Sequence, residues 1–484
     1  MALPASPNER IVVREARDVV NAINSGRVRG GNETAIVVIA LGGIFIDAYD
    51  FTSLAFGLPD IAEQFGLGAM AEGVVGASIM MGALLGALFG GYLVDRIGRY
   101  KMFMADMLFF VVSALGCAVA VNVEMLTTFR FLMGVGIGLD FPVALAFIAE
   151  YTALRGKGSR VNLWSPMWYL ATGATFLVLL AMYFLLPEGA HGDLWRWAVG
   201  FGAVPALVVM AVRHRYMEES ASWAARKGDL AHAVDILHRS YGVDAVLADD
   251  AVTTPPEKPR VSLDGFRRLV SPRYRRRTIL AGVVGAMQSA QYYAVGFFLP
   301  FIISEFLGQG VLTTIAAPMA FNFVFGVVGG FLGVFMTNRL GSWKLATYGF
   351  TACFVVLVAL GVLGEPTGTV PVLLVGLLLG LFMFSHSFGP GAQGMTMATL
   401  SYPTSLRGTG AGFGQAVLRI GSTVALVLFP ILTDQLGTGV FFIVAIAPLA
   451  ALITLMAIRW EPVGQDVDAD DFQEIDRPYE PVHA

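Results

Sequence analysis

The sequence is short of charge. Of its 484 residues only 14% are Asp, Glu, Lys or Arg, whereas 56% are hydrophobic and the mean hydropathy is +0.67. A soluble domain usually carries about 25% charged residues, so these charges are too few to cover the surfaces of several soluble domains. Twelve membrane crossings of about 21 residues would need roughly 250 apolar-dominated positions, which this composition supplies. The deficit excludes a soluble protein and favours an integral membrane protein.

Cysteine is also scarce. Cys117 and Cys353 both fall inside apolar runs, which excludes a disulfide framework or a zinc site. The pair Gly156-Lys157 is followed by Gly instead of Ser or Thr, so there is no P-loop and an ATP-driven pump is disfavoured. No nucleophile–base constellation stands out. We therefore expect no enzyme activity and no cofactor, with a proton gradient as the source of energy.

Apolar runs of about twenty residues recur along the chain, six on each side of a polar stretch. They lie at about 34–58, 70–94, 102–121, 124–149, 162–186, 195–212, 278–306, 312–337, 344–363, 369–398, 407–433 and 439–460. The predicted division is an N-terminal segment without a signal peptide (1–33), a six-helix bundle (34–212), a central loop (213–277), a second six-helix bundle (278–460) and an acidic tail (461–484). The tail is expected to be disordered.

Lys and Arg residues set the expected orientation. All but three of the 32 lie on one side of the predicted spans, the exceptions being Arg196 on the other side and Arg130 and Arg419 within spans. This places both termini in the cytoplasm. The basic loop at 213–277 is better explained by anionic lipid than by nucleic acid. We expect a monomeric, multi-pass protein of the cytoplasmic membrane, from a bacterium on the basis of its Ala/Gly/Val-rich composition.

The two halves repeat. "LPDIAEQF" (58–65) aligns with "LPFIISEF" (299–306), and "GGYLVDRIGRYK" (90–101) aligns with "GVFMTNRLGSWK" (333–344). Parallel six-helix repeats are a transporter architecture, with the substrate site at the repeat interface near the midplane.

The second repeated segment carries a motif of Gly and charged residues in a tight link between two spans. This motif resembles the loop signature of the major facilitator superfamily. The resemblance implies an all-α membrane protein with twelve transmembrane helices in two pseudo-symmetric six-helix bundles. It also implies a cytoplasmic gate, formed by Gly91, Asp95, Arg96, Gly98, Arg99, Glu150, Arg155, Arg339 and Arg407.

Two further segments resemble narrower families. Residues 130–151 are similar to span 4 of the sugar porters and of the phosphate:proton symporters, and residues 218–237 are similar to the stretch that follows span 6 in sugar porters. The Gly-Pro pair expected on span 5 of drug exporters is absent from 162–186. We therefore favour import over efflux.

Ionisable residues within spans are the strongest functional signal, because an unpaired charge at bilayer depth costs about 2.5–3.5 kcal/mol or more. Asp47 and Asp50 share one helix face, and Asp50 and Arg130 lie at nearly matched depth. We predict a switchable Asp50–Arg130 ion pair for proton coupling, a role that the resemblance to sugar porters also implies; a static buried pair is the alternative.

Asp140 and Asp47 resemble the two acidic positions of the phosphate symporters, which implies a role in proton coupling. The Tyr beside the second acid is missing here, where Phe141 stands, so phosphate itself becomes a doubtful substrate. The alternative role for Asp140 is helix packing through hydrogen bonds.

At the repeat offset, Asp47 and Asp50 align with Gln288 and Gln291. Amides donate and accept hydrogen bonds but do not titrate near neutral pH. We hypothesise that the first half binds the proton and the second half orients a polar substrate through Gln288, Gln291, Tyr292, Asn322 and Gln415. Helix–helix contact is the alternative for Gln288.

Arg419 lies deep in span 11, where a guanidinium suits a carboxylate or phosphate of the substrate. Pairing with Asp140 or another buried acid is an equal alternative. The aromatic residues Trp164, Trp168 and Tyr169 of span 5 line the cavity or meet lipid, and the sequence does not decide between these. For His386 we expect a hydrogen-bonded packing role.

Together these features predict a proton-coupled symporter that imports a small polar metabolite, namely an organic or sugar acid anion, by alternating access. A neutral sugar or polyol is the alternative substrate. A second alternative is a non-transporting membrane sensor on the same fold. Its sign would be a folded regulatory domain, for which neither the central loop nor the tail is long or apolar enough.

Overall fold

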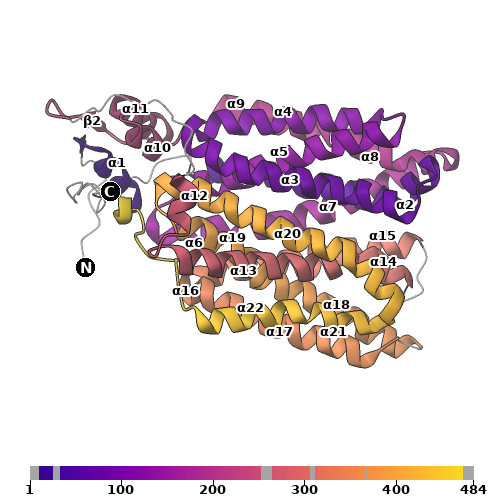
Figure 1. Cartoon of the computed structure of the whole chain (residues 1–484). Helices are drawn as coiled ribbons and strands as arrows, with labels where there is room; N and C mark the ends of the chain where they lie inside the picture. Colours follow the sequence, from indigo (N-terminus) through magenta and orange to yellow (C-terminus); the bar gives the residue numbers. More distant parts are fainter. Residues whose placement is uncertain (1–9, 26–32, 252–263, 306–310, 366–367, 472–484) are drawn as a thin grey trace, which may run out of the picture.

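The computed structural model describes residues 10–25, 33–251, 264–305, 311–365 and 368–471. Long helices run side by side, with those of the first half of the chain (indigo to magenta) stacked against those of the second half (orange to yellow) in Figure 1. Eleven helices in this described part are long and apolar enough to cross a membrane. The one remaining predicted crossing, which is the seventh along the chain, is also helical but interrupted. The twelve-helix expectation is therefore confirmed.

The first six crossings are mostly continuous helices. Their bounds are α2 (Glu33–Phe65), α3 (Ala69–Ile97), α4 (Arg99–Ala118), α5 (Val123–Tyr151), α7 (Trp164–Leu185), and α8 (Leu194–Phe201) with α9 (Ala203–Tyr216); the short α6 (Leu154–Asn162) precedes α7, and the 3₁₀ helix η1 (Glu188–Asp193) precedes α8. Asn122 caps α5 by accepting a hydrogen bond from the Met125 amide at 2.8 Å.

The last six crossings are more often broken. Their bounds are α13 (Arg275–Tyr292) with the π-helix η2 (Tyr293–Phe297) and α14 (Leu299–Glu305), α15 (Val311–Ala320) with the π-helix η3 (Phe321–Val327) and α16 (Val328–Leu340), α17 (Ser342–Leu363), α18 (Thr369–Phe388) with α19 (Pro390–Leu400), α20 (Thr404–Leu436), and the 3₁₀ helix η4 (Gly437–Gly439) with α21 (Val440–Val444) and α22 (Ile446–Ala457). The interrupted seventh crossing consists of α13, η2 and α14. Its buried amides, Gln288 and Gln291, lower its apolar character.

A small folded layer covers one end of the bundle, at the left of Figure 1. It contains β1 (Ile11–Val13) paired in parallel with β2 (Ala245–Leu247), together with α1 (Ala16–Ser25), α10 (Ala221–Arg226) and α11 (Leu230–Tyr241), and α12 (Asp264–Leu269) lies near it. Helix α11 buries one apolar face, including Leu230, Ile236 and Leu237. The central loop is therefore more structured than the sequence predicted. We call this end the terminal end.

Glycines allow two helices of the first half to touch along their backbones. A Cβ atom at Gly82 of α3 would lie 2.0 Å from the carbonyl oxygen of Phe131 on α5, and one at Gly134 of α5 would lie 2.1 Å from the carbonyl oxygen of Ile79 on α3. With glycine at these facing positions, α3 and α5 approach each other more closely than larger residues would permit.

Candidate functional site

A cavity lies between the two halves of the chain, and both contribute side chains to it. In this conformation side chains nearly fill the cavity, whose volume is about 30 Å³, so a substrate larger than water enters only when the lining side chains or the two halves move apart. Its lining residues are Phe141, Trp164, Ser165, Trp168, Tyr169, Gln288, Tyr292, Tyr293, His386, Gly391, Gln415, Leu418 and Arg419.

Four of the six residues expected from the sequence to bind substrate line this cavity, namely Gln288, Tyr292, Gln415 and Arg419. The other two are buried elsewhere. Asn322 donates its side-chain amide to the carbonyl oxygen of Pro318 at 2.8 Å, within the widened helix of η3. Both amide atoms of Gln291 lack a hydrogen-bond partner among the described residues, and this side chain is not part of the lining.

The span 5 aromatics line the cavity instead of facing lipid. Trp168 donates its indole N–H to the hydroxyl of Tyr292 at 2.9 Å, and the hydroxyl of Tyr169 lies 2.6 Å from Nδ1 of His386. Both bonds join the two halves. The other ring nitrogen of His386 lies 3.1 Å from the amide oxygen of Gln288, so His386 is a hydrogen-bonded residue that also faces the cavity.

Tyr293 is a lining residue that the sequence reasoning missed. It begins the π-helix η2, directly after Tyr292. A π-turn widens the helix, and such turns are frequent at functional sites. Two consecutive tyrosines thereby reach one cavity, which a regular 3.6-residue periodicity does not predict.

Arg419 is 2% exposed and faces the cavity from α20. It donates to the hydroxyl of Tyr293 at 3.2 Å, and its guanidinium carbon lies 5.0 Å from the centre of the Phe51 ring. Within the described residues it forms no ion pair with an acid at 4 Å or less. The alternative that it pairs with Asp140 is therefore wrong, because that acid has another partner.

The partner of Asp140 is Arg213, which lies at the end of α9. Its guanidinium contacts Asp140 at 3.0 Å and Asp106 of α4 at 3.4 Å, and all three side chains are fully buried. We expected Arg213 to be one of the loop residues that set orientation, and this was wrong. Arg213 follows the predicted apolar run 195–212 directly and lies in the last turn of α9. This position beside the run was the signal that could have revealed its burial.

Asp47 and Asp50 are buried on α2, and neither carboxylate has a hydrogen-bond partner among the described residues. Asp47 lies within electrostatic range of Arg419 and Arg213. Asp50 lies within electrostatic range of Arg130, but no ion pair joins these two side chains, and Nε and Nη1 of Arg130 are also unpartnered in the described structure. The predicted Asp50–Arg130 contact is thus not formed in this conformation.

The buried charged residues described so far include four acids and three bases. The acids are Asp47, Asp50, Asp106 and Asp140, and the bases are Arg130, Arg213 and Arg419. Because an uncompensated charge is costly at bilayer depth, a neutral core requires at least one of these acids to carry a proton.

At the terminal end, polar contacts join the two halves. Asp95 of α3 accepts hydrogen bonds from the backbone amides of Gly408 and Thr409, at 3.2 and 2.8 Å, and from the Thr409 hydroxyl at 2.8 Å. Glu150 binds Arg99 at 2.5 Å and lies 3.9 Å from Arg407 of α20. These contacts hold the two halves together at the terminal end.

The two copies of the repeated loop have the same local structure. Gly98 and Gly341 adopt positive φ values of 111° and 82°, a conformation that favours glycine, and each precedes a helix. A glutamate then accepts hydrogen bonds from the first backbone amides of that helix, Glu219 at the start of α4 and Glu461 at the start of α17. The sequence repeat revealed the glycines but not the glutamates.

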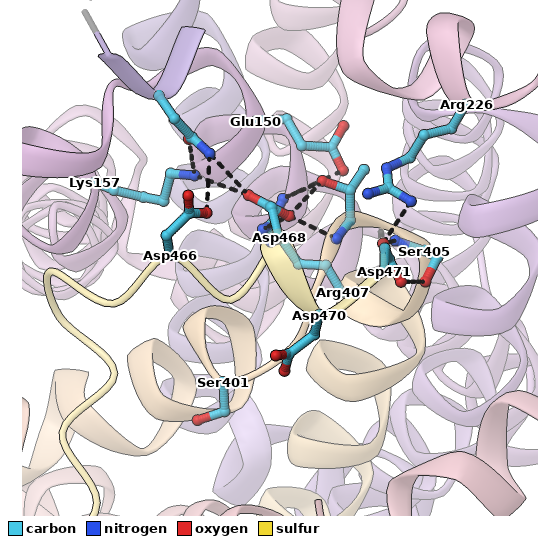
Figure 2. Close-up of polar contacts among 12 residues, drawn as sticks. Glu150, Lys157, Arg226, Ser401, Ser405, Arg407, Asp466, Asp468, Asp470 and Asp471 are labelled. Carbon is cyan, nitrogen blue, oxygen red and sulfur yellow. Dashed lines mark hydrogen bonds and ion pairs between the residues drawn. The ribbon is translucent and has the colours of Figure 1, made fainter. Parts of the chain in front are cut away.

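The beginning of the acidic tail is ordered, so the prediction of a disordered tail is wrong for residues 461–471. Figure 2 shows Asp468 between Lys157 and Arg407. Asp468 binds Arg407 at 2.8 Å and Lys157 at 3.5 Å, and its side chain is 5% exposed. Burial opposes its ionisation, but the positive charges of Arg407, Lys157 and Arg226 outweigh this and hold the pKa of Asp468 well below its usual value.

A second acid of the tail repeats this arrangement. Asp471 binds Arg226 of α10 at 2.5 Å and accepts a hydrogen bond from the hydroxyl of Ser405 at 2.5 Å (Figure 2). We call Asp468 and Asp471, with these partners, the tail clasp.

Four residues of the predicted gate remain. Arg339 is exposed, and its guanidinium carbon lies 4.2 Å from the centre of the Phe335 ring. Arg96 is half-buried at the end of α3. Gly91 and the side chain of Arg155 lie outside the residues that the structure describes in full.

A family model described as "Sugar (and other) transporter" matches residues 35–468. The chain belongs to this family. It is a membrane transporter of the major facilitator type and not an enzyme, as the sequence predicted. Within the described residues this transporter has no cluster of His, Cys, Asp and Glu that could hold a metal ion.

Several relatives of this transporter match over most of their length. It is 28% identical to the inner membrane metabolite transport protein YgcS of Escherichia coli, covering 84% of this chain and 86% of the relative. It is 27% identical to the niacin transporter NiaP of Acinetobacter baylyi, covering 93% and 99%, and 26% identical to the arabinose-proton symporter of Bacillus subtilis, covering 88% and 92%.

Solved structures confirm the fold. The proton:xylose symporter XylE bound to 6-bromo-6-deoxy-D-glucose superimposes with a TM-score of 0.75 at 16% identity, covering 93% of this chain and 99% of that one. The inward open conformation of XylE from E. coli gives a TM-score of 0.64 at 16% identity, covering 90% and 99%. The fold of this transporter is therefore the twelve-helix fold of the major facilitator superfamily.

Proposed function

We propose that this transporter imports a small organic acid anion together with protons across the cytoplasmic membrane, by alternating access. The observation that carries the proposal is Arg419, a buried cation that faces the cavity and forms no ion pair with a protein acid in the described structure. A guanidinium in such a site matches a carboxylate in both charge and geometry.

Asp47 supplies a reason why proton and anion would move together. When Asp47 is ionised, its charge balances that of nearby Arg419, and the empty site is neutral. When Asp47 is protonated, Arg419 is free to bind an anion, and the loaded site is neutral again. A proton alone or an anion alone leaves a net charge that must cross the bilayer, which is costly.

The remaining acids fit the same division. The core of the first half holds more acids than bases, whereas Arg419 and the amides of Gln288 and Gln415 come from the second half. This supports the hypothesis that the first half binds protons and the second half orients the substrate. The terminal end is assigned to the cytoplasm, because the basic residues gather there.

The comparisons are consistent with this proposal. One relative is named as an arabinose-proton symporter, and another as a transporter of niacin, which is a carboxylic acid. Proton coupling and carboxylate transport are thus both named among proteins about one quarter identical to this one.

The test is uptake into proteoliposomes under an imposed pH gradient. Organic acid anions should accumulate, and Arg419→Gln should abolish this. Asp47→Asn mimics the protonated acid, so it should keep substrate exchange across the membrane while losing accumulation driven by the gradient. Asp50→Asn serves as the parallel variant for the second acid, and Arg276→Gln, at an exposed position of α13, is the matched control.

Three outcomes would contradict the proposal. Accumulation that depends on the gradient in both acid variants would exclude Asp47 and Asp50 from coupling. Uptake of neutral sugars in preference to anions, with Arg419→Gln harmless, would replace the anion by a sugar. Failure of every solute to move would favour the sensor alternative.

A further inference from the structure

Aromatic rings form most of the wall of the central cavity. They come from both halves and are Phe141, Trp164, Trp168, Tyr169, Tyr292 and Tyr293. Neighbouring rings contact one another, with centroids 5.5 Å apart for Phe141 and Trp164 and 5.4 Å apart for Tyr292 and Tyr293. Such a wall offers flat apolar faces and ring edges to a ligand.

Most polar groups of this wall already bind one another. The Trp168 indole is bonded to the Tyr292 hydroxyl, and the Tyr169 hydroxyl and the Gln288 amide oxygen both contact the ring of His386. A polyhydroxylated ligand would have to exchange its water for protein partners at each hydroxyl, and every hydroxyl left without a partner weakens binding. A hydroxyl could use these groups only by breaking one of the bonds between them.

Three fully buried polar atoms of the lining side chains have no hydrogen-bond partner among the described residues. They are two donors, Nε of Arg419 and the indole N–H of Trp164, and one acceptor, the amide oxygen of Gln415. All three side chains line the cavity. A carboxylate accepts hydrogen bonds from donors of both kinds, and its charge matches Arg419.

From this arrangement we infer that the substrate is a planar aromatic monocarboxylate, whose ring packs between the aromatic side chains and whose carboxylate binds Arg419. The inference rests on the proposed anion symport and narrows its substrate class. A sugar acid has the same charge but lacks a flat apolar ring and carries hydroxyls that this wall does not match.

Calorimetric binding to the purified full-length protein in lipid nanodiscs tests the inference. The aromatic probes are benzoate, 4-hydroxybenzoate and pyridine-3-carboxylate. Cyclohexanecarboxylate keeps the charge and size of benzoate without the flat ring, benzamide keeps the ring without the charge, and gluconate is the polyhydroxylated acid. At least one aromatic carboxylate should bind at least about 10-fold more tightly than all three of these comparison compounds.

Two variants separate the roles of charge and ring. Arg419→Gln should weaken binding of the aromatic carboxylate by roughly 10- to 100-fold, because charged hydrogen bonds are lost, and should leave benzamide unaffected. Trp164→Phe keeps the ring and removes one donor, so it should have a smaller effect on the carboxylate alone. Thermal unfolding of each variant controls for loss of the fold, and Arg419→Lys, which keeps the charge, provides a second reading.

The outcomes distinguish this inference from the proposed function. If gluconate binds more tightly than the aromatic acids and accumulates under a pH gradient, the aromatic class is wrong and anion symport stands. If neutral sugars bind and no carboxylate does, both are wrong. If none of the aromatic acids binds at millimolar concentration, or if cyclohexanecarboxylate binds as tightly as benzoate, the inference is overturned.

Discussion

The tail clasp should hold the terminal end of the transporter closed. Asp468 is fixed to the second half by the Thr404 hydroxyl and by Arg407, both at 2.8 Å, and reaches Lys157 of the first half. Asp471 is fixed to Ser405 and reaches Arg226, whose helix is bound to the first half through a hydrogen bond from the Trp223 indole to the carbonyl oxygen of Asp95. Replacing both acids by asparagine keeps their shape and removes both bridges.

The size of the effect follows from how deeply the two bridges are buried. The side chains of Lys157 and Asp468 are 8% and 5% exposed, and those of Arg226 and Asp471 are 15% and 5% exposed. Exposed ion pairs contribute about 0–1 kcal/mol, whereas removing one partner of a fully buried pair costs about 3–5 kcal/mol. At about 2 kcal/mol for each bridge, the double variant should change the ratio of closed to open molecules on the order of 10³-fold.

Spin labels on the two halves can report this change. Ile97 and Lys344 are exposed at the ends of α3 and α17, so nitroxides on cysteines placed there give an electron–electron distance across the terminal end. The native Cys117 and Cys353 are buried. A longer distance population should appear in the double variant, and Asp466→Asn, at an exposed neighbouring acid, should keep the wild-type distribution.

A second control removes a different bridge between the halves. Asp95→Ala loses three hydrogen bonds to Gly408 and Thr409 and should also open the terminal end. If this variant opens while the clasp variant keeps the wild-type distances, the reasoning about the tail is refuted. A chain shortened after residue 471 keeps the clasp and should stay closed, whereas a chain shortened after residue 465 should open.

Three further predictions concern the buried charges, the tail and the helix packing. Arg213→Gln leaves Asp106 and Asp140 buried without a cation, so its melting temperature should fall by more than that of Arg213→Lys, which keeps the charge; equal melting temperatures for Arg213→Gln and the wild type would contradict this. The lowered pKa of Asp468 keeps this carboxylate ionised, so its contribution to stability is present above its unfolded-state pKa and is lost only as the pH falls toward its lower folded-state pKa. The spin-label distances of the wild type should therefore stay the same between pH 5 and pH 8. A change over this range in the wild type that is absent from the clasp variant would argue against this reasoning. Gly82→Ala places a methyl group against backbone, so thermal unfolding should show a loss of about 1–3 kcal/mol or more.

Much of the fold was readable from the sequence because membrane crossings are long, apolar and recurrent. The twelve runs, the repeat and the repeated glycine turns at Gly98 and Gly341 are local features, and the structure has them at nearly the predicted places. Charged residues within apolar runs, such as Asp47 and Arg419, were visible for the same reason.

Residues near the ends of spans were harder to interpret. Arg213 and Lys157 have the positions of ordinary loop cations, and only the packing of other elements around them shows that both are buried. The ordered part of the tail is a similar case. Its acidic composition favours disorder, but the partners of Asp468 come from residues more than 60 positions away in the sequence.

The sequence by itself determined the class of protein, the number of crossings and the candidate charges, since these depend on composition and periodicity. The tertiary structure decided how those charges pair: Asp140 with Arg213, Asp468 with Arg407 and Lys157, and Arg419 with no acid in the described part of the chain. It also decided which aromatic rings face the cavity. Pairing and facing depend on how helices from distant parts of the chain pack together, and no local pattern of residues records that packing.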